Sequence, residues 1–149
     1  MKKIITALLV CALPLAGAAA GKSASRPGKP PRSLTAKLPE LAPEGKKNPL
    51  PGGGWFTWSF AARPKLGTAI IKVQLFDKAG SREKNLEFIG ESGMPSMPYH
   101  DSGPVKFQLN KKGDYLLPVD LVMAGEWQLT IRVRKEKREI YAAKVLFAL

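Results

Sequence analysis

From residue 52 onward the apolar residues recur at every second position, and this period of two limits the fold more than any other feature of the chain. The alternation runs through residues 55–60 and 69–76. It is clearest over 126–134, where the apolar positions from Trp127 to Val133 share one parity. Successive side chains of a strand point to opposite faces of a sheet, so this period predicts strands with one face in the core and the other in water. We therefore expect an all-β domain.

Shorter runs with the same period bring the expected number of strands to about seven within residues 52–149. These runs are 86–89, 105–109, 115–121 and 140–148. Turn-forming residues at 110–114 and a charged turn at 135–139 separate them, and Pro118 predicts an edge or bulged strand. The count and spacing predict an immunoglobulin-like seven-stranded antiparallel β-sandwich, with an up-and-down barrel as the structural alternative.

Residues 1–20 have the three-part order of a secretory signal peptide. Lys2 and Lys3 precede an apolar run, and a tail of small residues leads to Ala20, after which we expect cleavage; Ala18 is the near alternative. The apolar run is shorter than the ~20 residues that span a bilayer, so we expect a mature chain without a transmembrane segment. This interpretation places the mature protein in the periplasm or outside the cell. A retained N-terminal anchor is the alternative.

Residues 21–51 contain seven prolines and no apolar period of either kind. Proline interrupts both helices and strand ladders, so we expect a disordered, extended linker with partly polyproline II conformation. Seven basic and two acidic residues give this segment a net charge of +5, out of +12 for the whole chain. Such a basic linker is able to contact anionic lipid or envelope polymers, although a soluble spacer is the simpler interpretation.

The counts of reactive residues exclude most enzyme chemistry. The chain has one cysteine, Cys11, which lies within the expected signal peptide, and one histidine, His100. A disulfide framework and a multi-histidine metal cage are therefore excluded. No nucleophile or oxyanion site accompanies the histidine, so we expect a protein that is not an enzyme. Nucleic acid is a poor partner, because the basic residues are not interleaved with aromatic residues that would stack on bases.

One segment, G-M-P-S-M-P-Y-H, carries the residues best suited to bind a ligand. Met94, Met97 and His100 recur at a spacing of three, and thioether sulfur and imidazole nitrogen suit the soft ion Cu(I). The prolines favour polyproline II, in which these residues would share one edge at intervals of about 9 Å. A three-ligand site then needs a bend near Pro98 or a further donor, and Met123 is the one other methionine beyond the signal peptide. The sequence thus predicts a Cu(I) site drawn from these three methionines and the histidine.

The same residues have a simpler structural interpretation. Methionine fills irregular gaps in protein cores, so Met94 and Met97 would plug one end of the sandwich. His100, beside Asp101, would then be an exposed loop residue with a local hydrogen bond. Both interpretations stay open at the level of the sequence.

The G-M-P-S-M-P-Y-H segment and the downstream segment L-V-M-A-G-E-W-Q-L-T-I-R-V together resemble the YtkA-like and FixH-like group of small exported or membrane-anchored β-sandwich domains. In that group a turn with a tyrosine, here Tyr115, follows the first segment. The second segment then matches a Met-x-Gly-x-Trp strand entry, here Met123, Gly125 and Trp127. The resemblance covers roughly residues 53–149. It implies an immunoglobulin-like sandwich and a link to copper handling or to the assembly of copper-containing oxidases.

Two functional hypotheses follow, beside a third interpretation in which the domain is only a scaffold in a larger complex. The first is an exported, non-enzymatic β-sandwich protein that binds Cu(I) and acts in copper handling or copper-enzyme assembly. The alternative is an envelope interaction module that binds a protein or polyanion through its basic linker and the basic hairpin at 135–138. Salt separates the two hypotheses, because screening weakens contacts between exposed charges and leaves thioether ligation unchanged.

Overall fold

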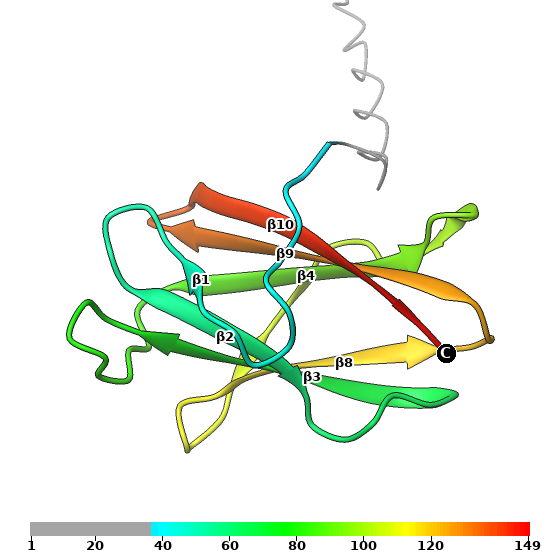
Figure 1. The fold of residues 1–149 in the computed structure, drawn as a ribbon, viewed down its shortest axis with the longest axis horizontal. Coiled ribbons are helices and arrows are strands. Elements are labelled where there is room, and N and C mark those ends of the chain that lie inside the picture. The colour runs from blue at the N-terminus through cyan, green and yellow to red at the C-terminus, as the bar shows by residue number, and fades with distance from the viewer. Residues whose placement is uncertain (1–36) are drawn as a thin grey trace, which may run out of the picture. The chain divides into compact units, whose positions relative to one another are not determined.

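A computed structural model describes residues 37–149, and these residues form two antiparallel β-sheets that face each other (Figure 1). In spatial order, the first sheet consists of β1 (Asn48–Pro49), β2 (Trp55–Phe60), β3 (Gly67–Phe76), β8 (Tyr115–Leu121) and β7 (Gln108–Leu109). The second consists of β10 (Arg138–Ala148), β9 (Glu126–Lys135), β4 (Glu87–Met94) and β5 (Met97–Asp101), with β6 (Val105–Lys106) paired to β4. The predicted β-sandwich is confirmed. The predicted signal peptide and residues 21–36 of the predicted linker lie outside the described residues.

The order of the longer strands is that of an immunoglobulin-like domain. In that fold one sheet has the order A-B-E-D and the other contains G, F and C, to which variable-type domains add C′. Here β2-β3-β8-β7 corresponds to A-B-E-D, and β10-β9-β4-β5 corresponds to G-F-C-C′. The up-and-down barrel is thereby excluded, because consecutive strands such as β3 and β4 lie in different sheets. Among residues 37–149, no helix has the length and apolar character needed to cross a bilayer.

The strand count differs from the prediction in two places. The described residues form ten strands, of which seven have five or more residues and three have two. The run 105–109, predicted as one strand, is divided: β6 pairs with β4 in one sheet, and β7 pairs with β8 in the other. Between them Phe107 is buried, and its N–H donates to the carbonyl oxygen of Phe88 at 2.9 Å. The additional long strand is β5, which lies in the segment predicted as an extended loop.

An aromatic cluster centred on Phe88 joins the two sheets. Phe88 of β4 is fully buried, and its ring contacts Phe56 of β2 at 5.5 Å and Tyr115 of β8 at 4.7 Å between ring centroids. The Tyr115 hydroxyl donates to the carbonyl oxygen of Leu86 at 2.9 Å, which links the sheets by a hydrogen bond as well. Immunoglobulin domains place a tryptophan on strand C at the centre of the core, and Phe88 occupies the corresponding strand here.

Strand β9 confirms the predicted apolar face and corrects the predicted polar one. Leu129, Ile131 and Val133 are fully buried, as the period of two predicts. On the opposite parity, Gln128 and Thr130 were expected in water but are buried too, at 3% and 1% exposure. The strand is central in its sheet, with β4 on one side and β10 on the other.

Residues 38–51, which we call the strap, run along the open side of the sandwich. The N–H of Leu41 donates to the carbonyl oxygen of Lys144 in β10 at 2.7 Å, so the strap begins on the second sheet. It then reaches the first sheet, where the Trp58 indole N–H donates to the carbonyl oxygen of Ala42 at 2.8 Å and β1 pairs with β2. Leu41 and Leu50 are both buried in the core.

The prediction of a disordered linker through residue 51 is therefore wrong for residues 38–51, and the sandwich begins before residue 52. Proline does exclude ladder bonding, but the strap needs few ladder bonds. It uses isolated backbone contacts and buries two leucines, together with Asn48, whose side-chain oxygen accepts from the N–H of Ala42 at 2.8 Å. These contacts offset the entropy lost when the segment is ordered.

We expect Leu41→Ala to lower the free energy of unfolding by about 2–4 kcal/mol, because it leaves a cavity between the strap and the core. Urea denaturation followed by tryptophan fluorescence measures this change. Leu66→Ala is the matched control, because Leu66 is 59% exposed in the β2–β3 connection. Its expected effect is within about 0.5 kcal/mol. Equal effects of the two substitutions would contradict a packed strap.

Asp114 joins two connections at one end of the sandwich. Its carboxylate accepts hydrogen bonds from the Arg82 guanidinium at 2.7 Å and from the Gln74 side-chain amide at 2.8 Å. Arg82 also donates to the carbonyl oxygen of Gly113 at 2.8 Å. The hydrogen bond from Arg82 is the main cause that lowers the pKa of Asp114 to about 2, against the opposing effect of burial. The ionised carboxylate thus holds the β3–β4 connection against the β7–β8 turn.

The lowered pKa of Asp114 predicts a stability loss in acid. The folded-state pKa of about 2 lies below the ordinary aspartate pKa of 3.8, so the ionised group stabilises the fold above pH 4, and this stability is lost as the pH falls toward 2. We expect Asp114→Asn to cost about 1–2 kcal/mol at pH 7 and progressively less toward pH 2. Urea denaturation at several pH values tests this. The exposed Asp120→Asn is the control at pH 7, and a wild-type-to-Asp114→Asn difference that stays constant with pH contradicts the assignment.

Candidate metal site

The segment that carries Met94 and Met97 is a β-hairpin at the edge of the second sheet. Met94 ends β4, Pro95 and Ser96 form the turn, and Met97 begins β5, with the two methionines as direct cross-strand partners. Partners in an antiparallel pair have Cα atoms about 4.5–5.5 Å apart, closer than the spacing of about 9 Å expected for polyproline II. The expected extended loop is therefore wrong for these two residues, which the hairpin brings together. An edge strand tolerates Pro98, because the missing N–H faces no partner.

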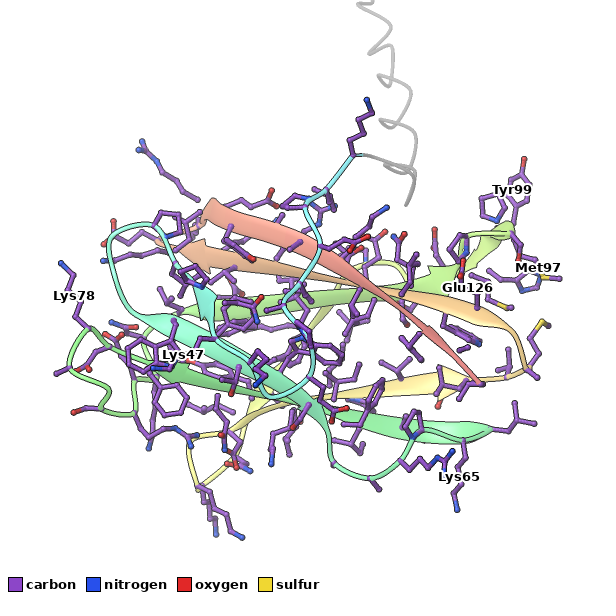
Figure 2. The ribbon with its side chains drawn as sticks, in the orientation of Figure 1. Lys47, Lys65, Lys78, Met97, Tyr99 and Glu126 are labelled. Atoms are coloured by element: carbon purple, nitrogen blue, oxygen red, sulfur yellow. The ribbon has the colours of Figure 1, made fainter. Side chains whose placement is uncertain are left out.

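The two methionines differ in exposure. Met94 is 4% exposed and belongs to the core, whereas Met97 is 40% exposed at the hairpin tip. Figure 2 shows Met97 and Tyr99 projecting from one end of the sandwich, near Glu126 at the start of β9. The burial of Met94 agrees with the interpretation that methionine plugs this end. Met97 is accessible from solvent.

Gly125 makes room for Met94. A Cβ atom at Gly125 would lie 2.8 Å from the Met94 methyl carbon, so a larger residue there would displace the methionine. Gly125 also has a φ of +140°, a backbone conformation that favours glycine. The β8–β9 connection therefore approaches Met94 closely, and this connection also carries Met123, which packs against the core and is half-buried. Thus all three methionines lie around this hairpin and this connection.

Trp127 fixes the conformation of the β8–β9 connection. It is buried at the start of β9, and its indole N–H donates to the carbonyl oxygen of Met123 at 3.0 Å. In immunoglobulin-like domains a tyrosine at the same corner, between strands E and F, bonds back to the backbone a few residues upstream. A tryptophan performs this role here. The sequence motif Met-x-Gly-x-Trp is thus explained by packing and a hydrogen bond.

His100 is separated from the methionines by an irregularity in β5. Met94 pairs with Met97 and Gly93 pairs with Asp101, so residues 98–100 have no partner on β4. His100 is exposed on this bulge and lines an open depression of about 430 Å³ together with Asp120 and Trp127. None of the methionines lines it. The structure therefore brings Met94 to Met97 and to the connection of Met123, but not His100 to them.

Carboxylates near His100 do not complete a metal site of the usual kind. Asp101 and Asp120 line the same depression, and the Asp101 carboxylate accepts from the N–H of Gly103 at 3.3 Å. Among residues 37–149, no group of three or more histidine, cysteine, aspartate or glutamate side chains is placed to hold a metal ion. Thioethers are outside that set of ligands, so any metal site at this end would depend on the methionines.

Sequence reasoning missed the exposed residues of this end. Tyr99 is 97% exposed and Val122 is 67% exposed, and both line the depression with His100. An aromatic side chain at the tip of an edge strand cannot be distinguished from a core residue by its position in the sequence. The one available signal was Pro98, which marks an edge strand and so an exposed neighbour.

Comparisons with protein-family models and with curated proteins found no match for this chain. The resemblance to the YtkA-like and FixH-like group, with its implied link to copper, therefore stays a prediction that depends on the two motifs alone.

We expect Trp127→Phe to destabilise the protein by about 1–2 kcal/mol, because the carbonyl oxygen of Met123 loses its buried hydrogen-bond donor while the aromatic packing is largely kept. Thermal or urea unfolding measures the loss. Trp55→Phe is a suitable control, since Trp55 is half-buried and stacks on Phe76. If Trp127→Phe is as stable as the wild type, the corner hydrogen bond does not hold the connection.

Proposed function

We propose that this chain is an exported, non-enzymatic β-sandwich protein that binds Cu(I) at the end formed by Met94, Met97 and Met123 and acts in copper handling or copper-enzyme assembly. The observation that carries the proposal is the cross-strand pairing of Met94 with Met97, next to the connection that carries Met123. Neutral thioether donors suit a soft monovalent ion, and they avoid the disulfide chemistry that threatens thiolates in an oxidising compartment.

The different exposures of the methionines suggest how the site would work. Met97 is accessible and would meet the incoming ion first. Met94 would supply the inner donor, held in position by the core and by the close approach of Gly125. Met123, on the facing connection, would complete a three-sulfur set after a change of its side-chain rotamer. An exposed first ligand and a buried second one favour transfer of the ion to and from a partner.

His100 has a secondary place in this proposal. Its position on the bulge, in a depression without methionines, favours a role as an outer ligand or in contact with a partner. The surrounding carboxylates of Asp101 and Asp120 would raise the local concentration of cations at this end.

A Cu(I) titration of the purified protein against a colorimetric chelator, under reducing conditions, tests the proposal. We expect about one equivalent to be held, and affinity to fall more than about tenfold in Met97→Leu, which is equivalent to about 1.4 kcal/mol. Leucine conserves volume and removes the sulfur, so the fold is kept. Met94→Leu and Met123→Leu should each weaken binding as well, and His100→Ala should weaken it less than Met97→Leu does.

The matched control is Leu146→Met, which adds a thioether at an exposed position of β10 and should leave the stoichiometry unchanged. Failure of the wild type to compete with the chelator, or equal binding by Met97→Leu and the wild type, contradicts the proposed site. In that case the methionines are packing residues.

A further inference from the structure

The end of the sandwich opposite the methionines is strongly basic. Four connections meet there: residues 50–54, the β3–β4 connection, the β7–β8 turn and the β9–β10 turn (Figure 1). Apart from Arg82, which is paired with Asp114, we consider eight exposed cations that lie on or next to them. We call this set the basic end: Lys47, Lys78, Lys84, Lys111, Lys112, Lys135, Lys137 and Arg138. Figure 2 shows Lys47 and Lys78 here, and Lys65 at the other end of the molecule with Met97.

Contacts between the connections hold these cations on one surface. The side chain of Lys78 crosses over Gly53, where an added Cβ would lie 2.2 Å from the lysine Cε. The side chain of Lys84 packs in the same manner over Gly113, at 2.7 Å, in the turn that carries Lys111 and Lys112. Lys78 and Lys135 line one pocket, which joins the β3–β4 connection to the β9–β10 turn. The cations thus form one surface.

The acidic residues of this region are mostly occupied with internal contacts. Asp114 is paired with Arg82 at 2.7 Å, and Glu139 is paired with Arg132 at 3.3 Å. The Asp77 carboxylate accepts from two backbone N–H groups of its own turn, and Glu83 accepts from the side-chain amide of Asn85. Internal contacts of these four carboxylates leave the cations of the basic end, together with the exposed Glu136 of the β9–β10 turn, as the charged groups that face solvent. The surface therefore attracts anions.

A pocket lined by both apolar and charged residues lies within the basic end. Its volume is about 220 Å³, and Lys78 and Lys135 stand among its lining residues. The remaining lining includes the aliphatic side chains Leu50, Leu75, Leu86 and Ile140. The carboxylates of Asp77 and Glu83 also line the pocket, and both accept hydrogen bonds within the β3–β4 connection. Lysines beside a pocket that is partly lined by aliphatic side chains fit an amphiphile, in which a negative headgroup is joined to a hydrocarbon chain. A fully hydrophilic polyanion would use the lysines and leave the pocket empty.

We propose that the basic end binds the surface of a membrane containing anionic phospholipid, with phosphate groups on the lysines. Lysine contributes a compact, hydrated charge that suits a dense layer of headgroups, whereas bidentate recognition of single anions favours arginine. Arg82, in the β3–β4 connection, is already bonded to Asp114. The aromatic ring nearest the lysines, Trp55, is stacked on Phe76 at 5.6 Å and lies under the Lys47 ammonium at 4.1 Å. It therefore does not offer a stacking platform for nucleic acid bases.

This inference is independent of the proposed copper function. A protein held at a membrane by its basic end would direct the methionine hairpin away from the lipid, because the two groups lie at opposite ends of the same strands. Failure of Cu(I) binding would leave the membrane contact unaffected, and the reverse also holds.

Sedimentation of the purified protein with vesicles tests the inference. We expect binding to vesicles of phosphatidylcholine with 30% phosphatidylglycerol, little binding to pure phosphatidylcholine, and a large loss of binding when salt is raised from 0.05 to 0.5 M, because salt screens exposed charges. Lys78→Glu with Lys135→Glu should weaken binding more than about tenfold. The matched control, Arg63→Glu with Lys65→Glu, makes the same change of net charge at the other end and should bind nearly as the wild type does. Near-ultraviolet circular dichroism checks that each variant is folded.

Three results would overturn the inference. Equal losses in the two double variants would show that net charge alone controls binding. Equal binding to charged and neutral vesicles would exclude phosphate recognition by the lysines. Tight binding to soluble polyphosphate without binding to the anionic vesicles would assign the basic end to a hydrophilic polyanion.

Discussion

Contact between the two sheets through Phe88 is the interaction on which the rest of the structure depends. The single cysteine of the chain lies at position 11, so no disulfide is able to pin the sheets of the described sandwich, and aromatic burial takes its place. Phe88 meets Phe56 and Tyr115 from the facing sheet and Phe107 from the segment that crosses between the sheets. On the same strand, Gly90 allows Leu117 to approach closely, since a Cβ atom there would lie 2.2 Å from a leucine methyl carbon. The aromatic rings around Phe88 and the missing side chain of Gly90 together set the separation of the two sheets.

Because this core fixes the strands, the connections between them are the segments whose sequence is free to vary. The strap and the Trp127 corner both cover apolar groups of the core, and each includes an indole hydrogen bond to a backbone carbonyl oxygen. The connections at both ends are then positioned by strands that are already fixed. Functional side chains on these connections do not disturb the packing of the core. This is the general reason that functional residues of sandwiches gather at their ends.

The parts of this structure that the sequence predicts are those with a repeated pattern. Strands β3 and β9 were predicted within two residues, because their side chains alternate over many positions. The strap was missed, because Leu41 and Leu50 are isolated among prolines and have no period. Strand β5 was missed because Pro98 argues against a strand, and only an edge position makes it acceptable.

The geometry of the candidate metal site was likewise not predictable from a local sequence pattern. The sequence spacing predicted Met94, Met97 and His100 at equal intervals. In the structure a two-residue turn brings the methionines together, and His100 lies on a bulge away from them. Turn type and bulges depend on how β4 pairs with its neighbours, and pairing is a property of the whole sheet. Spacing along the chain was therefore a poor guide to the geometry of this site.

The opposite chemistry of the two ends is compatible within one small domain because the strands separate them. Strand β9 begins with Glu126 beside the methionine hairpin and ends with Lys135 in the basic end, and its ten residues span roughly 30 Å. The screening length in physiological salt is about 8 Å, so the lysines exert little repulsion on a cation at the far end. The basic end and the proposed Cu(I) site are thus able to act without opposing each other. The long, straight strands of the sandwich supply the distance that makes this separation effective.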